Sequence, residues 1–175
     1  MLPEFQRKFA EQYYSDDKYR RFLEELDREV GMHIEYRVCE MPIFVSNSFK
    51  KVLEESAVAV ALECMTPAHL AASDGSLKPQ HTVPNQNSKP LFVIVDFALS
   101  LDEHGNYIPK VVELQGFPSL FGYQFLLAKH LKQFYHFEQN FSHTFSNLSN
   151  QEYIQLLHSA IIGKHDPDET CLLEF

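Results

Sequence analysis

The sequence has no tryptophan, few cysteines and no long run of apolar residues. Its three cysteines, Cys39, Cys64 and Cys171, are odd in number and far apart, so they match neither a zinc-binding spacing nor a disulfide framework. No stretch approaches the ~20 consecutive apolar residues that a membrane-spanning helix needs. These shortages argue against a disulfide-linked domain and a membrane-spanning helix, and they favour reduced thiols in the cytoplasm.

Positive charge is scarce as well. Lysine and arginine together number 15, against 24 aspartates and glutamates, which gives a formal net charge of −9. A protein that binds nucleic acid needs a basic face, and a polybasic membrane anchor needs clustered lysines and arginines. The first ten residues carry charged side chains and no apolar core segment, so they do not form a secretory signal. We therefore expect a cytoplasmic protein that binds neither nucleic acid nor membrane.

Apolar and aromatic residues are plentiful. Hydrophobic residues make up 45% and aromatic residues 13% of the 175 positions, whereas charged residues make up 22%. Such a composition can fill a core and is not that of a disordered chain. We expect residues 1–175 to form a single domain. The apolar sequence TCLLEF at residues 170–175 has the composition of a strand, and a domain rarely ends in the middle of an apolar strand. We therefore also expect this domain to be the N-terminal piece of a longer chain.

Local signals predict several helices. Ser15 or Asp16 is a suitable N-cap and Gly31 a suitable end for one helix, and Ser46 is a suitable cap for another that extends to about residue 64. The centre of that second helix, AVAVAL, predicts burial on more than one side. A capping-box sequence, Ser-Asn-Gln-Glu at residues 149–152, predicts a helix over residues 151–162.

Alternation and apolar runs predict strands at residues 34–45, 91–98 and 109–115. The run LFVIVDFA at 91–98 predicts a strand that is covered on both faces, and the short turn after it predicts an antiparallel hairpin. Between the first two strands, the proline-rich residues 66–90 indicate a long loop with a short helix near 68–72. The fold class is therefore α/β: a mixed sheet with a central antiparallel hairpin flanked by helices. Residues 1–65 form a helix-rich entry with one strand, and residues 91–175 hold the hairpin and further helices.

Three oxygen-bearing side chains fall within the hairpin. Glu113 and Gln115 are two residues apart on one strand, so they project to the same face, and Asp96 on the other strand can point at them. Mg²⁺ is held by one or two carboxylates together with substrate phosphates. The spacing thus allows Asp96, Glu113 and Gln115 to bind a metal ion. The alternative is that these residues face solvent at a sheet edge or pair with an arginine.

The stretch DFALSLDEHGNYIPKVVELQGFPSLFGYQ resembles the metal-binding hairpin of circularly permuted ATP-grasp enzymes such as glutathionylspermidine synthetase. In that family an Asp-Phe strand precedes a turn, and a second strand carries Pro-x-hydrophobic-hydrophobic-Glu-x-Asn before a proline and a small hydroxyl residue. The matching positions are Asp96-Phe97, Pro109 to Glu113, Gln115 and Pro118-Ser119. The chain is also similar over nearly its whole length to the N-terminal part of bacterial ATP-grasp-like proteins, through VELQGFPSL and HDPDETCLLEF.

The resemblance implies a partial, N-terminal ATP-grasp-like unit in which Asp96, Glu113 and Gln115 bind Mg²⁺ that bridges the phosphates of ATP. The complete enzyme would form an acyl phosphate from a small carboxylate, which an amine then attacks. Two departures are the glutamine in place of asparagine and Ile94 in place of the usual arginine. The strands and glycine-rich loop that hold ATP have no candidate in the chain, so we expect it to be inactive alone. An exposed apolar face would dock the missing C-terminal lobe or cause an artificial homodimer.

Ser119 begins the helix predicted after the hairpin, and the amides at that helix start can receive a carboxylate or a phosphate. As a nucleophile it would need a base and an oxyanion hole, so a capping role is favoured. The nine histidines match no zinc-binding spacing. The alternative function is a free-standing, non-catalytic domain that binds a ligand or a protein. A metal-dependent hydrolase ranks last, because no candidate base accompanies the acids.

Overall fold

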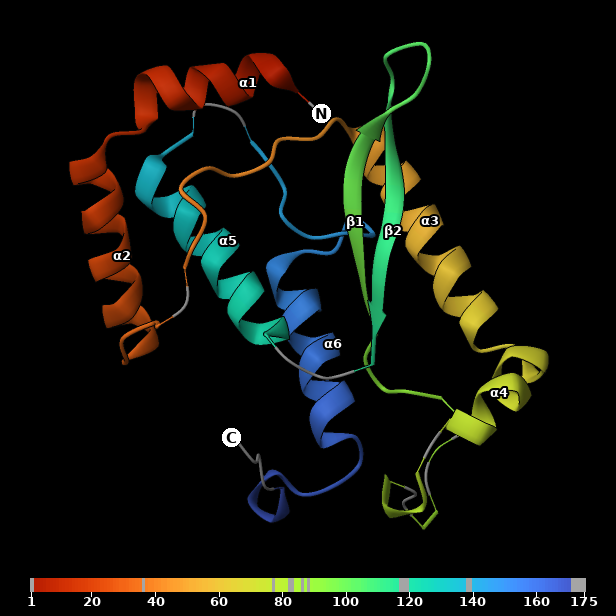
Figure 1. Cartoon of the computed structure of the whole chain (residues 1–175). Coiled ribbons are helices and arrows are strands. Elements are labelled where there is room, and N and C mark those ends of the chain that lie inside the picture. The colour runs from red at the N-terminus through yellow and green to blue at the C-terminus, as the bar shows by residue number, and fades with distance from the viewer. Residues whose placement is uncertain are drawn as a thin grey trace. The chain divides into compact units, whose positions relative to one another are not determined.

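The computed structural model describes residues 2–35, 37–76, 78–81, 84–85, 87, 89–116, 120–137 and 140–170. Within these ranges the chain forms six α-helices and one two-stranded antiparallel sheet (Figure 1). The chain divides into two compact units, and it passes from one to the other three times. The first unit comprises Met1–Gln12 and Met41–Ser119, and the second comprises Tyr13–Glu40 and Leu120–Phe175.

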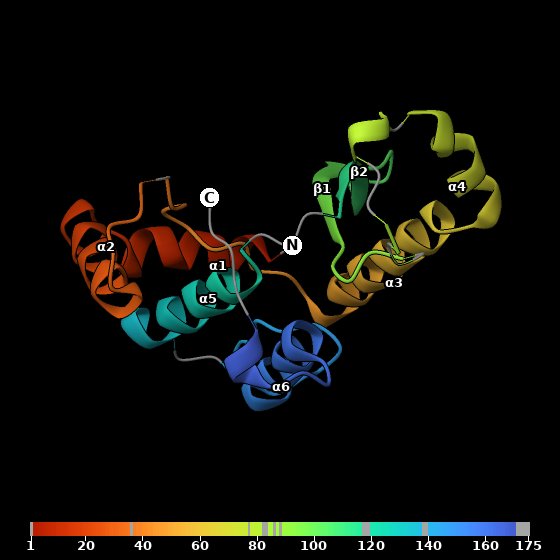
Figure 2. The same ribbon diagram turned by 90° about the horizontal axis from the view of Figure 1, so that it is seen from below.

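The first unit is built on a β-hairpin that packs against a long helix. Its elements are α1 (Pro3–Lys8), α3 (Asn47–Cys64), α4 (Pro67–Ser73), β1 (Ile94–Leu101) and β2 (Tyr107–Gln115). Helix α3 begins where the hydroxyl of Ser46 accepts the N–H of Phe49 at 3.2 Å. It then runs along one face of the hairpin (Figures 1 and 2), where the ring of Phe49 meets that of Tyr107 with centroids 6.4 Å apart.

The second unit consists of three helices, α2 (Asp16–Val30), α5 (Phe121–Tyr135) and α6 (Asn150–Ile162). Helices α2 and α5 pack side by side, and the side chains of Phe22 and Leu26 on α2 are fully buried. Helix α6 contacts the first part of α5, because the rings of Phe125 and Tyr153 stack with centroids 4.8 Å apart. The aromatic residues of this region therefore form much of the core, as their number predicts.

The local helix signals are confirmed. The hydroxyl of Ser15 accepts the N–H of Lys18 at the start of α2, and Gly31 ends that helix with a left-handed φ of 83°. The capping box at Ser149 forms with both of its hydrogen bonds, and α6 follows it directly. Helix α4 confirms the short helix expected near residues 68–72. Helices α2 and α6 were predictable because caps act within a few residues of the chain.

The strand expected at residues 34–45 is wrong over the described part of that range, which excludes Tyr36. Side chains of helical residues form hydrogen bonds with backbone carbonyls of this segment, which in a sheet would be bonded to a neighbouring strand. The hydroxyl of Tyr19 donates to the carbonyl of Val38, and the amide of Gln6 donates to the carbonyl of Pro42 at 2.6 Å. The sheet is consequently a two-stranded antiparallel hairpin throughout the described chain, and not a mixed sheet.

Two expectations about burial are wrong as well. The strand predicted at residues 91–98 is not covered on both faces, because Asp96 and Ala98, which project to one face of β1, are exposed. Helix α3 is not buried on more than one side, since Val58 and Leu62 in its apolar centre are each 58% exposed. The strand predicted at the end of the chain lies largely outside the described residues, which stop at residue 170.

None of the helices in the described ranges combines the length and the apolar character needed to cross a membrane.

Candidate functional site

The hairpin is set by its turn. The carboxylate of Asp102 accepts the backbone N–H groups of His104 at 2.9 Å and Asn106 at 2.7 Å. It also accepts the side-chain amide of Asn106 at 3.0 Å, and these hydrogen bonds, that from the Asn106 side chain foremost, lower the pKa of Asp102. Gly105 adopts a left-handed φ of 79° that completes the turn. The turn thereby fixes which residues of the two strands face each other.

A β-bulge at Val112 brings the acidic residues to one face. Phe97 pairs with Val111 and Asp96 pairs with Glu113, so Val112 has no partner on β1. Strand side chains alternate between faces, and the extra residue shifts that alternation by one position. Without the bulge, Glu113 would lie on the same face as Tyr107, whose ring contacts that of Phe49 on α3. With it, Glu113 lies opposite Asp96 on the other face.

The three predicted ligands meet on this second face. Asp96 and Glu113 are direct cross-strand partners, and the side-chain amide of Gln115 donates to the carboxylate of Asp96 at 3.1 Å. Both acids are exposed to solvent rather than buried among apolar side chains. Their exposure thus differs from the coverage on both faces that was expected for the strand at residues 91–98, because α3 packs on the opposite face of the hairpin.

The donors suit a hard cation, although they are few. Directly opposed like charges destabilise an antiparallel pair, and a cation between the two carboxylates would remove that repulsion. No group of three or more histidine, cysteine, aspartate or glutamate side chains in the described chain is arranged to hold a metal. Gln115 must therefore contribute the third ligand. For this its amide has to rotate, so that its oxygen and not its nitrogen faces the metal ion.

The predicted contact of Ser119 with a carboxylate or a phosphate cannot be placed beside these three side chains. Ser119 lies outside the described residues, so its role at a helix start remains a prediction. Helix α5 itself begins at Phe121, with Leu120 in the N-cap position and no side-chain cap.

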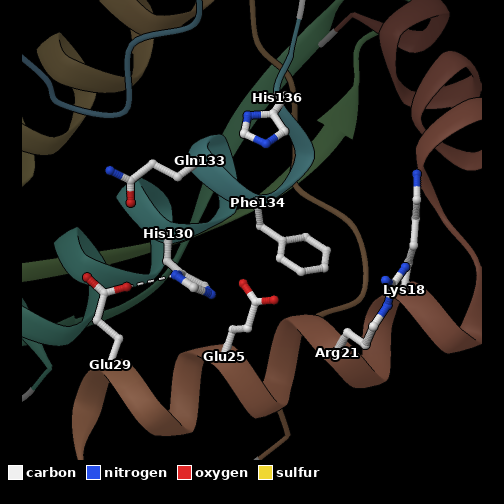
Figure 3. Close-up of a pocket in the computed structure, with 8 residues that line it drawn as sticks. All are labelled: Lys18, Arg21, Glu25, Glu29, His130, Gln133, Phe134 and His136. Carbon is white, nitrogen blue, oxygen red and sulfur yellow. Dashed lines mark hydrogen bonds and ion pairs between the residues drawn. The ribbon is translucent and has the colours of Figure 1, made fainter.

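A second polar site lies in the second unit, and the sequence did not predict it. A groove of about 520 Å³ runs between α2 and α5 (Figure 3). In its wall the ring nitrogen Nδ1 of His130 is 2.7 Å from the carboxylate of Glu29. The side chain of His130 is only 9% exposed, and its Nε2 has no hydrogen-bond partner among the described residues.

The missed site had a partial signal in the sequence. Lys18, Arg21, Glu25 and Glu29 follow one another at spacings of three or four residues, which places them along one face of a helix. That stripe is ordinary for a solvated helix face, and it carries no information about His130. The contact between Glu29 and His130 spans 101 residues, so only the folded chain shows it.

Comparison with known proteins does not assign the chain to a family. No protein-family model matches the sequence, and neither the curated proteins nor the solved structures gave a match.

Proposed function

We propose that this chain is the N-terminal part of an ATP-grasp-type ligase that joins a small carboxylate to an amine, and that its hairpin supplies the ligands for Mg²⁺. The observation that carries the proposal is the pairing of Asp96 with Glu113, with Gln115 hydrogen-bonded beside them. The bulge at Val112 supports it, because bulges commonly re-aim side chains at functional positions.

In the proposed enzyme Asp96 and Glu113 hold the metal, and the amide oxygen of Gln115 completes the protein's share of its ligands. Bound Mg²⁺ would neutralise charge on the phosphates of ATP. The exposure of both carboxylates suits this role, because Mg²⁺ keeps several waters and takes its remaining ligands from substrate phosphates. The two acids hold the cation at the solvent-facing side of the hairpin, where a nucleotide can reach it.

The chain alone would not complete the reaction. The sequence has no glycine-rich phosphate-binding loop with its lysine, so a further lobe has to supply the remaining contacts to ATP. We place the reaction in the cytoplasm, because three widely spaced cysteines do not form a disulfide framework.

The metal assignment can be tested on this chain without any substrate. Mn²⁺ takes the same kinds of oxygen ligand as Mg²⁺, and it broadens the NMR signals of nearby amides. We expect Mn²⁺ to broaden the amides around Asp96 and Glu113 first, and Mg²⁺ in excess to restore them. The double substitution Asp96→Asn, Glu113→Gln should abolish this selective broadening.

Glu103→Gln is the matched control, because Glu103 is an exposed acid in the turn of the same hairpin. It should leave the broadening around Asp96 unchanged. If the double variant and the control behave alike, or if the broadening is spread over all surface acids, the metal assignment is wrong.

The second candidate is a non-catalytic domain that binds another protein, and exposed apolar side chains support it. Val112 is 66% and Val111 is 49% exposed on β2, and Leu62 on α3 is 58% exposed. In a complete ligase these side chains would contact the missing lobe, whereas in the isolated chain they would promote an artificial homodimer.

Sedimentation separates the two candidates. If the apolar surface is a protein-binding site, Val112→Asp should abolish binding of the partner or of a second copy, while the Asp96 and Glu113 substitutions should not. Self-association that disappears in Val112→Asp, in a chain that fails to bind Mn²⁺ at the hairpin, would favour the interaction domain over the ligase.

A further inference from the structure

The groove between α2 and α5 has a cationic half and an acidic half. On α2, Lys18 and Arg21 line one end, and Glu25 and Glu29 follow along the same helix face. In Figure 3 the two cationic side chains lie at one end of the groove, and Glu29 with His130 lies at the other. The charges are thus separated along the groove rather than mixed.

These charges are largely unneutralised by the protein. Residues of like charge one helical turn apart destabilise a helix, and this stripe contains two such pairs, Lys18 with Arg21 and Glu25 with Glu29. Arg21 precedes Glu25 by four residues, which is the weaker order for a helical ion pair. No salt bridge of Arg21 or Glu25 occurs among the described residues. Glu29 alone has a nearby cation, Lys129 at 3.6 Å.

His130 gives the acidic end a buried acceptor. In the tautomer whose Nδ1–H donates to the carboxylate of Glu29, 2.7 Å away, Nε2 is an acceptor. Figure 3 shows Nε2 pointing from the groove wall toward the side chain of Glu25. A buried acceptor without a donor carries a free-energy cost. A donor placed beside Glu25 would remove that cost.

We propose that this groove binds a small linear zwitterion, with its anionic group at Lys18 and Arg21 and its ammonium group at Glu25. The ammonium would donate to the carboxylate of Glu25, toward which Nε2 of His130 points. Along the helix axis, Arg21 lies about 6 Å and Lys18 about 11 Å from Glu25. The anionic and ammonium groups of the ligand are therefore expected to be about 6–11 Å apart. The volume of about 520 Å³ is that of a small-molecule site.

The apolar wall favours a ligand with a methylene chain. The ring of Phe134 lines the groove, and its centroid is 6.3 Å from that of His130. A chain of methylene groups between the charged ends would contact this ring. The proposal does not depend on the ligase function, because the groove lies in the second unit and the metal-binding hairpin in the first.

Titration calorimetry at low salt tests the proposal with three probes of equal length. ε-Aminocaproate carries both charges, caproate lacks the ammonium and hexylamine lacks the carboxylate. We expect ε-aminocaproate to bind at least about tenfold more tightly than either single-charge analogue. Absence of binding by ε-aminocaproate, or equal binding of caproate, would overturn the proposal.

Substitutions locate the binding site. Arg21→Gln and Glu25→Gln should each weaken binding of ε-aminocaproate by about tenfold or more, and both change exposed side chains, so the fold should persist. The matched controls are Arg20→Gln and Glu24→Gln, which alter exposed residues of α2 that do not line the groove. If the controls weaken binding as much as the groove variants, the zwitterion binds elsewhere and the assignment is wrong.

Discussion

At the scale of single residues, Asp96 and Glu113 oppose each other in the hairpin although both are acidic. We expect Glu113→Gln to stabilise the chain in the absence of divalent cations, by about 0.2–1 kcal/mol, because it removes a directly opposed like charge. Urea denaturation in the presence of a chelator measures the change. Glu103→Gln, in the turn, should leave the free energy of unfolding unchanged.

Addition of Mg²⁺ should reverse this order. The wild-type chain gains stability from a cation that binds only the folded state, and Glu113→Gln should gain much less. A variant that is less stable than the wild type in chelator would contradict the repulsion on which the metal site rests.

His143 makes stability depend on pH. Both of its ring nitrogens are buried without a hydrogen-bond partner among the described residues, and its ring lies 5.2 Å from that of Phe125. Burial, and secondarily the charge of Lys132, lowers the pKa of His143 from its ordinary value of 6.5. The unfolded chain therefore takes up a proton near pH 6.5 that the folded chain resists.

The sign follows from this difference in proton binding. The free energy of unfolding should be independent of His143 above pH 6.5 and should fall as the pH drops below that value toward the folded pKa. Denaturation curves at several pH values measure the slope, and His143→Leu should make it shallower. An unchanged slope in that variant would show that other groups cause the acid sensitivity.

At the scale of elements, the sequence predicts best what local chemistry decides. Ser15, Ser46 and Ser149 each cap a helix as expected, because a cap needs only the first turn of its own helix. The bulge at Val112 has no glycine or proline to signal it, and it emerges only from the register of the two strands. The false strand at residues 34–45 has a similar cause, since Tyr19 and other distant side chains bond to its backbone.

The capping box gives a prediction at this scale. Ser149 accepts the N–H of Glu152 at 3.2 Å while the carboxylate of Glu152 accepts the N–H of Ser149 at 2.7 Å. Ser149→Ala should destabilise the chain by about 1 kcal/mol in urea. Ser159→Ala, the same change at an exposed position inside α6, should be neutral or slightly stabilising. Equal effects of the two substitutions would contradict the cap.

At the scale of the whole molecule, the ligase proposal requires more protein than these 175 residues. We expect the native gene product to be much longer, because the lobe that holds ATP has to follow the hairpin. Intact-mass spectrometry of the natural protein measures this directly. A product of 175 residues would eliminate the ligase and leave the interaction domain as the function.

The candidate sites differ in how much of them the sequence could predict at this scale. Asp96, Glu113 and Gln115 lie within one hairpin, so strand alternation predicts that Glu113 and Gln115 share a face, whereas the bulge at Val112 that brings them to the face of Asp96 could not be predicted. The groove requires α2 and α5, whose contacting residues Glu29 and His130 are 101 positions apart. No periodicity in the sequence links segments that are so distant, so nothing in the sequence marks His130 as part of a site.

Because the chain passes between its two units three times, its order of folding and its tolerance of truncation are constrained. Residues 41–119 belong to the first unit and lie in sequence between the two segments of the second. Helices α2 and α5 therefore come into contact only when the ends of this long insertion are brought together. Closing a long loop is entropically costly and slows folding. Truncation before residue 120 would remove α5 and leave the apolar side of α2 in water. A ligand that binds both α2 and α5 would stabilise the closed loop formed by residues 41–119. Hydrogen exchange of the hairpin amides, which lie within that loop, would show whether ligand binding protects them.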